Sequence, residues 1–332
     1  MGGVIIAILV CGGAGYIGSH AVKELVAGNE NVIVLDNLST GHEKAVHAKA
    51  KLYEGDLRDE AILRKIFTEH KIVTVMHFAA SSLVGESVEK PIEYYDNNVS
   101  AAITLLKVMK EFDIYEFIFS STAATYGDVQ EDLITEETRT NPTNPYGETK
   151  LAIERLLKWY SQSNEFKYKV FRYFNVAGAS LDSTIGEDHT PETHLIPIVL
   201  EVALGKRAEI KVFGEDYPTE DGTCIRDYIH VEDLVDAHIL GIHHLRETKE
   251  SDVYNLGNGL GFSVLDIITS AKKVTGKVIP YSIAERRPGD PAKLVASSKK
   301  AQEVLRWSPK YPSIVGIIET AWKWHVRNPE GY

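Results

Sequence analysis

The strongest constraint on the fold is the alternation of apolar runs with helix-like segments in the first half of the chain. A continuous apolar run, as a strand covered on both faces would need, lies at residues 4–10. Further strand-like segments lie at residues 31–36, 51–56, 72–79, 116–121 and 169–178. Helical patterns fall between them at residues 19–27, 59–69 and 91–112, the last of which we expect to be broken near its start. This alternation predicts an α/β fold with a doubly wound parallel sheet.

The pattern becomes irregular after about residue 180. Short strands and helices are mixed there, residues 216–223 are rich in turn formers, and a final helix is expected at residues 314–326. We therefore predict a sheet domain over residues 1–178 and a smaller mixed α/β lobe over residues 179–332, with some crossing of the chain between them.

Composition restricts the partners and the compartment. The formal net charge of −11 argues against nucleic acid or an anionic membrane as the main partner. The two cysteines, Cys11 and Cys224, form no CxxC or His/Cys cluster, so no metal site and no disulfide framework are expected. The opening apolar run is too short to span a bilayer and lacks the flanks of a signal peptide, which predicts a cytoplasmic protein.

A glycine-rich loop, "CGGAGYIGSH", joins the first predicted strand to the first predicted helix. Gly12, Gly15 and Gly18 have the spacing that a tight turn, close approach to a pyrophosphate and close helix packing require. Asp36 ends the second strand, where a carboxylate can bind both hydroxyls of an adenosine ribose, and Asp56 ends the third. No basic residue follows Asp36 directly, so this Rossmann-type domain is predicted to bind NAD rather than NADP.

A tyrosine and a lysine four residues apart follow the fifth strand. Asn144 and Pro145 predict a helix start, which would place Tyr146 and Lys150 on one face of that helix. Alone, the spacing fits two surface residues equally well. Beside a nicotinamide cofactor, the Lys150 ammonium would favour the phenolate of a tyrosine whose pKa is normally near ~10, and Thr122 at the end of the strand could hold the same substrate oxygen.

Together these motifs resemble the extended short-chain dehydrogenase/reductases, and within them the UDP-glucose 4-epimerase family. The resemblance covers nearly the whole chain and is carried by "HFAASSLVGESVEKPIEYYDNNV", "FRYFNVAGA", "FGEDYPTEDGTCIRDYIHVEDL", "NLGNG" and "RRPGD". It implies catalytic roles for Thr122, Tyr146 and Lys150, and a homodimer formed through helices at residues 91–112 and 145–161.

The resemblance also implies two sets of ligand contacts. Residues implied to bind NAD are Gly12, Gly15, Tyr16, Ile17, Gly18, Asp36, Asn37, Asp56, Leu57, Phe78, Ala79, Asn97, Lys150 and Tyr173. Residues implied to bind the UDP-sugar are Thr122, Tyr146, Phe174, Asn175, Leu195, Phe213, Arg226, Tyr228, Arg287 and Asp290. Arg226 and Arg287 are the local cations that a diphosphate needs in an acidic protein.

The sequence departs from the family pattern at three positions. Thr122 stands where a serine is usual, Ser82 where a lysine is common, and His194 where an amide usually meets the diphosphate. Leu294 matches a residue that gates the sugar pocket, and its intermediate size leaves the use of N-acetyl sugars open.

The resemblance implies reversible epimerisation of UDP-galactose and UDP-glucose at C4 through a 4-keto sugar, with enzyme-bound NAD. Two alternatives share the fold. A sugar-nucleotide 4,6-dehydratase would be expected to carry Asp-Glu after the hydroxyl, where this chain has Ala123 and Ala124. A non-catalytic NAD-sensing protein would have no reason to keep Tyr146, Lys150 and the hydroxyl together.

Overall fold

The computed structural model describes residues 5–129, 131–287 and 290–332, and this part of the chain divides into two compact units. The sheet unit consists of Met1–Gly127, Arg139–Arg172 and Val235–Tyr254. The mixed unit consists of Asp128–Thr138, Tyr173–Leu234 and Asn255–Tyr332. Both units are therefore discontinuous in sequence, and each contains segments from both sides of residue 178.

Seven strands among the described residues form one sheet, in the order β11-β6-β5-β4-β1-β2-β3. The pairs β1–β2, β2–β3, β1–β4 and β4–β5 are parallel, and the strand order reverses direction beside β1 as in a doubly wound fold. The strands are β1 (Ile6–Cys11), β2 (Val32–Asp36), β3 (Lys51–Glu54), β4 (Lys71–His77), β5 (Glu116–Thr122), β6 (Lys167–Tyr173) and β11 (Asp252–Leu256).

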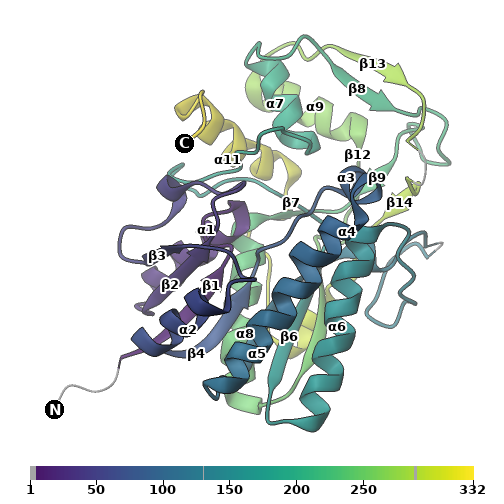
Figure 1. Cartoon of the computed structure of the whole chain (residues 1–332). Coiled ribbons are helices and arrows are strands. Elements are labelled where there is room, and N and C mark those ends of the chain that lie inside the picture. The colour runs from purple at the N-terminus through teal and green to yellow at the C-terminus, as the bar shows by residue number, and fades with distance from the viewer. Residues whose placement is uncertain (1–4, 130, 288–289) are drawn as a thin grey trace. The chain divides into compact units, whose positions relative to one another are not determined.

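Helices α2, α5 and α6 lie against the sheet (Figure 1). Each buries an apolar face there, where strand residues such as Leu9 and Phe117 pack against helix residues such as Leu63 and Leu105. The helices of this unit are α1 (Tyr16–Ala27), α2 (Glu60–Glu69), α3 (Val84–Glu89), α4 (Pro91–Tyr94), α5 (Ala101–Glu111), α6 (Pro145–Ser163) and most of α8 (Val231–Thr248), with 3-10 turns η1 (Glu43–Ala45) and η3 (Ala123–Thr125).

The helix predicted at residues 91–112 contains a π-helical turn. Between α4 and α5, η2 (Tyr95–Ser100) has π-helical hydrogen bonds while the backbone stays helical at both joins. A π turn inserts a residue into the helix and rotates the side chains that follow, which is why such turns gather at functional sites. Asn97, one of the predicted cofactor residues, lies in this turn.

The mixed unit is built from short sheets and four helices among its described residues. Strands β7 (Asn175–Ala177) and β10 (Tyr228–His230) pair, as do β8 (Ile210–Phe213) and β13 (Tyr281–Ala284), while β12 (Phe262–Ser263), β9 (Ile225–Arg226) and β14 (Lys293–Leu294) form a third sheet. Helices α7 (Leu195–Ala203), α9 (Val264–Thr275) and α11 (Ile314–Arg327) share an apolar core, and α10 (Lys299–Val304) completes the set.

The predicted elements are present, with two differences. The first helix begins at Tyr16 rather than at residue 19, because Gly15 is extended and serves as its N-cap. The run predicted as one strand at 169–178 is divided at Phe174, after which the chain pairs with β10 instead of continuing β6.

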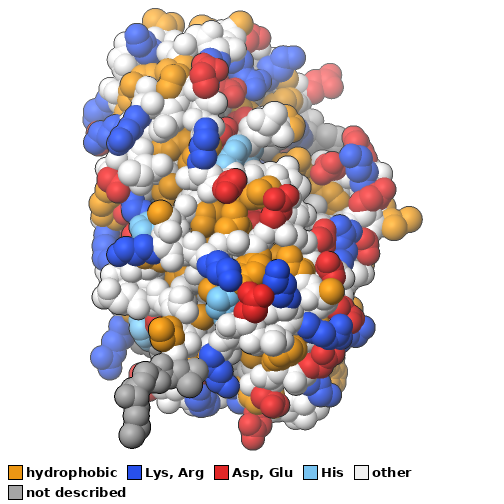
Figure 2. All heavy atoms as spheres, turned by 60° about the vertical axis from the view of Figure 1, so that its left-hand side comes forward, with side chains coloured by type: hydrophobic (Ala, Val, Ile, Leu, Met, Phe, Trp, Pro, Cys, Tyr) orange, Lys and Arg blue, Asp and Glu red, His pale blue; other side chains and the backbone are white. Residues whose placement is uncertain are grey.

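The surface carries charges of both signs. On the face that Figure 2 shows, lysine and arginine side chains are interspersed with aspartate and glutamate. Among the described residues, no helix is long and apolar enough to cross a membrane.

Candidate functional site

The glycine loop lies between β1 and α1, and close contacts require glycine at two of its positions, Gly12 and Gly18. Gly12 has a φ of +78°, and a Cβ there would lie 2.5 Å from the backbone N of Ala79. A Cβ on Gly18 would overlap the carbonyl oxygen of Gly12. Gly15 precedes the helix with no side-chain cap, which leaves the first amides of α1 directed at the loop. Such a backbone cradle at a helix N-terminus fits a phosphate.

Asp36 connects this loop to the second strand. Its Oδ2 accepts a hydrogen bond from the amide of Ala14 at 2.9 Å, and its Oδ1 accepts one from Leu38 at 2.9 Å. Each carboxylate oxygen can accept more than one hydrogen bond, so a ribose diol can still be bound.

The residues that follow β3 lie next to β2, the strand that ends with Asp36. Asp56 forms a 2.7 Å ion pair with Arg58, and this pairing lowers the pKa of Asp56 to about 2, with a smaller contribution from Asn37. Leu57 is buried.

The loop after β4 is fixed by the π turn. The amides of Phe78 and Ala79 donate to the carbonyl of Cys11, at 2.9 and 3.1 Å, so this loop lies on the end of β1. Asn97 Nδ2 donates to Ser81 Oγ at 3.0 Å. The buried Asn98 accepts from the amide of Ser81 and donates to its carbonyl, which anchors the loop through both backbone groups of one residue.

Tyr146, Lys150 and Thr122 are brought together at the start of α6. Asn144 caps the helix by accepting from the amide of Gly147 at 2.9 Å, as the sequence predicts. Lys150 is 3% exposed, and its Nζ donates to the carbonyl of Ser120 at 2.9 Å. Thr122, at the end of β5, hydrogen-bonds the phenol of Tyr146. The hydroxyl and the phenol are therefore in contact, while the Lys150 amine lies against β5 at Ser120. Together these residues make up the Thr122–Tyr146–Lys150 cluster.

Burial dominates the titration of this cluster. Burial raises the pKa of Tyr146 to about 12, although the hydrogen bond from Thr122 lowers it. Burial also lowers the pKa of Lys150 to about 7, with Glu154 raising it. The sequence analysis expected Lys150 to favour the phenolate; in the chain alone, the desolvation of the phenol outweighs any such effect.

A buried ion pair lies behind Lys150. Glu154, one turn further along α6, accepts from Arg172 Nε at 3.0 Å and Nη2 at 2.5 Å, and from Ser121 Oγ at 2.5 Å. Arg172 Nη1 donates to the hydroxyl of Tyr126 at 3.0 Å. The sequence analysis missed this pair, because residues of a helix and a strand so far apart in sequence carry no shared spacing.

The mixed unit holds the predicted arginine contacts. Arg226 Nη1 donates to the carbonyl of Pro291 at 2.9 Å, and Arg226 Nη2 lies 3.5 Å from Asp290 Oδ1. The guanidinium of Arg287 lies 4.0 Å from the ring centroid of Phe213. The four predicted residues therefore form two pairs, Arg226 with Asp290 and Arg287 with Phe213. Pro288 and Gly289 of the "RRPGD" motif lie outside the described residues.

The other predicted residues of this unit lie on short elements. Asn175 is opposite Tyr228 in the β7–β10 pair, and Leu195 is the first residue of α7. Tyr173 ends β6, and the backbone N–H of Phe174, which lies between the two strands, donates to Leu256.

The structure shows the contacts of the residues that depart from the family pattern. Thr122 Oγ1 also caps η3 by accepting from the amide of Ala124 at 3.1 Å, so the stiffer side chain is held in place. Ser82 is exposed after β4. Leu294 is opposite Arg226 in the β9–β14 pair. His194 Nδ1 lies 2.8 Å from Glu187 Oε1, within a group of ligating side chains that the sequence analysis did not foresee.

That group consists of Glu187, His189, Glu192 and His194, whose ligand atoms all lie within 4.8 Å of one another. The expectation of no metal was based on cysteine spacing. A signal was available in the alternation of two carboxylates and two imidazoles within eight residues.

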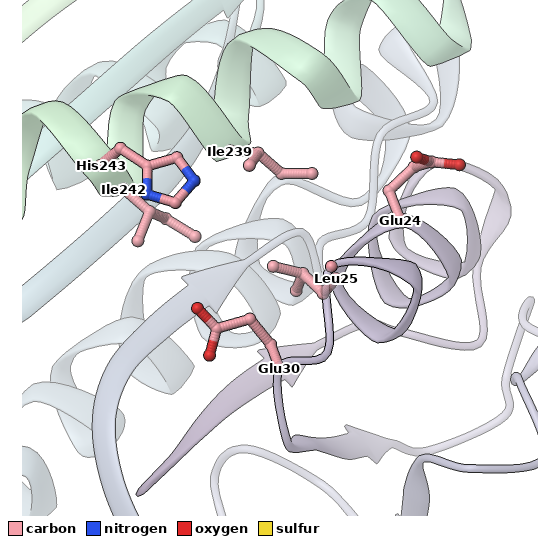
Figure 3. Close-up of a pocket in the computed structure, with 7 residues that line it drawn as sticks. Glu24, Leu25, Glu30, Ile239, Ile242 and His243 are labelled. Atoms are coloured by element: carbon pink, nitrogen blue, oxygen red, sulfur yellow. The ribbon is translucent and has the colours of Figure 1, made fainter.

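A small surface pocket lies elsewhere in the sheet unit (Figure 3). It is at the C-terminal end of α1, whereas the glycine loop is at the N-terminal end, so it is not part of the nucleotide cradle. Its lining comes from α1, from the turn between α1 and β2, and from α8. These residues are Glu24, Leu25, Gly28, Glu30, Ile239, Ile242 and His243.

Comparison with known proteins gives consistent matches over the whole chain. The sequence model of the NAD dependent epimerase/dehydratase family matches residues 8–257. UDP-glucose 4-epimerase of Halalkalibacterium halodurans is 58% identical over 98% of this chain and 97% of its own, and that of Lactobacillus helveticus is 55% identical over 98% of both chains.

Solved structures of UDP-glucose 4-epimerases also match this chain over nearly its whole length. A crystal structure of a UDP-glucose 4-epimerase is 64% identical, with a TM-score of 0.97, over 98% of this chain and 99% of that one. The Bifidobacterium longum UDP-glucose 4-epimerase in complex with NAD⁺ and UDP is 42% identical, with a TM-score of 0.93, over 98% of this chain and 100% of that one. The chain therefore belongs to the NAD dependent epimerase/dehydratase family, within which it groups with the UDP-glucose 4-epimerases.

Proposed function

We propose that the protein interconverts UDP-galactose and UDP-glucose by inverting C4 of the sugar. The observation that carries this proposal is the cluster of Thr122, Tyr146 and Lys150 at the carboxyl end of the sheet. Relatives whose names state this activity match over nearly the whole chain, which supports the assignment.

The residues of the sheet unit fit a bound dinucleotide. The cradle of Gly12, Gly15 and Gly18 would hold its pyrophosphate, Asp36 its adenosine ribose, and Lys150 its second ribose. Bound NAD⁺ would accept the C4 hydride and return it, and its positive charge would favour the phenolate of Tyr146.

The chain itself moves one proton. Tyr146 would take the proton from O4 as the alcohol is oxidised, and would give it back to O4 when the alcohol is restored. Thr122 would hold O4 near the phenol, and Glu154 favours the ammonium form of Lys150. Because the proton returns to the sugar, no atom is gained or lost.

In the mixed unit, Arg226 and Arg287 would bind the diphosphate, with Asp290 and the backbone of residue 291 holding Arg226 in place. Asn175, Leu195, Phe213 and Tyr228 would complete the nucleotide site. Because the UDP part anchors the substrate, the hexose can rotate and present its other face between the two hydride transfers. The position of Leu294 beside Arg226 supports a role in sugar selection, with galactose and glucose as the proposed sugars.

An NMR assay tests the proposal. Purified protein with UDP-galactose and no added cofactor should yield UDP-glucose up to a constant ratio, because the hydride returns to the same sugar. A 4-keto-6-deoxy product would instead establish the dehydratase. No product after addition of NAD would leave the sensing protein as the better account.

We also propose a homodimer formed through α4–η2–α5 and α6. The supporting observation is exposed apolar surface on these adjoining helices, with Trp159 71% and Ile92 79% exposed. Trp159→Glu should convert a dimer into a monomer in light scattering coupled to gel filtration. The matched control is Val278→Glu, an exposed apolar position in the mixed unit, which should leave the dimer intact. A wild-type monomer would contradict the proposal.

Cytoplasmic residence is part of the same proposal. Cys11 and Cys224, the two cysteines of the chain, are both free thiols, and Cys11 is buried, as is usual in a reducing compartment.

A further inference from the structure

Four metal-ligating side chains lie in the segment that leads into α7. Glu187, His189, Glu192 and His194 fall within eight residues, and His194 is also the N-cap of that helix. None of the roles proposed above uses these four residues.

The donor atoms are close enough together for one ion to reach all four side chains after small shifts, since all lie within 4.8 Å of one another. Ligands about 2.0–2.1 Å from a tetrahedral zinc ion are about 3.3–3.4 Å from one another. His189 Nδ1 lies 3.5 Å from Glu187 Oε1 and 3.7 Å from Glu192 Oε2. His194 Nδ1 lies 2.8 Å from Glu187 Oε1 and 3.3 Å from Glu192 Oε1.

The carboxylates are held before any ion binds. Glu192 Oε1 accepts from the amides of Thr193 at 2.7 Å and His194 at 2.8 Å, so its position is set by the backbone. The side chain of Glu187 is only 5% exposed, whereas that of His194 is 46% exposed, which gives an ion a route from solvent.

The two carboxylate charges are the second argument. The side chains of Glu187 and Glu192 are only 5% and 6% exposed. Carboxylates removed from water need a positive partner, and one divalent cation held between them would supply two positive charges.

We propose that these four residues bind one divalent transition-metal ion, and that zinc fits the ligand set best. Two imidazole nitrogens select zinc and its neighbours in the first transition row over magnesium or calcium, which prefer oxygen ligands alone. The bound ion fixes the entry to α7, at whose start Leu195 lies.

Calorimetry on the full-length protein as purified, after dialysis against EDTA, tests the site with ZnCl₂ and with MgCl₂. We expect one zinc ion per chain and no comparable binding of magnesium. Absence of one-to-one zinc binding at pH 8 would overturn the proposal.

Variants locate the ion. His189→Gln and, separately, His194→Gln should each weaken zinc binding by at least about tenfold and abolish the zinc-dependent rise in Tm. The matched control is Asp188→Asn, in the same segment but outside the four ligands, which should bind zinc as the wild type does. His194→Gln changes an exposed side chain, so it remains informative if His189→Gln fails to fold. Unchanged zinc binding in His194→Gln would contradict the assignment.

Discussion

Tyr146→Phe should lower kcat by about 10³-fold, within the range that a positioned acid or base contributes. The substitution removes the phenol that exchanges a proton with O4 but keeps the ring that fills the site. Content of bound NAD, measured on the denatured protein, should therefore stay at the wild-type level. The two measurements together separate lost chemistry from lost cofactor.

A matched control lies on the same helix. Tyr160→Phe removes a hydroxyl near the other end of α6, where the ring packs on Phe166, and should change kcat by less than about twofold. Turnover of Tyr146→Phe close to that of Tyr160→Phe would show that the phenol takes no part in proton transfer.

Arg172→Met should lower the free energy of unfolding by about 3–5 kcal/mol, as expected when one member of a buried ion pair is removed. The reason is that Glu154 would remain in the interior without the guanidinium that now donates to both of its oxygens. Urea unfolding at pH 7, followed by tryptophan fluorescence, measures the change.

The double variant Arg172→Met/Glu154→Leu is the decisive comparison. It removes both charges, so most of the lost stability should return, although Ser121 and Tyr126 each lose a hydrogen-bond partner. Equal losses in the single and double variants would mean that the unpaired Glu154 carboxylate is not what destabilises Arg172→Met.

The sheet was predictable from the sequence because its signals are local. Continuous apolar runs mark the strands, and the caps Asn144 and Asp59 each lie directly before the helix they begin. The glycine loop was equally predictable, because the spacing of its glycines and its place between a strand and a helix are local features.

Contacts between residues on different elements, and the burial that those contacts produce, were not predictable in this way. The contact of Glu154 with Arg172 joins a helix to a strand, and burial rather than spacing sets the pKa values of Tyr146 and Lys150. The π turn that holds Asn97 and Asn98 has no distinct periodicity over six residues. The contacts within the site therefore follow from the folded structure and not from local sequence patterns.

The discontinuous composition of the sheet unit has a consequence for synthesis on the ribosome. The segment Val235–Tyr254 supplies most of α8, whose His238 packs on Phe171 of β6, and the start of β11 at the sheet edge. Until that segment emerges, Phe171 of β6 lacks the helix that packs on it, and β6 remains an open edge. The N-terminal part of the sheet unit is therefore complete only after residues 235–254 have been synthesised. Chaperones that bind apolar surface have the most time to act during that interval.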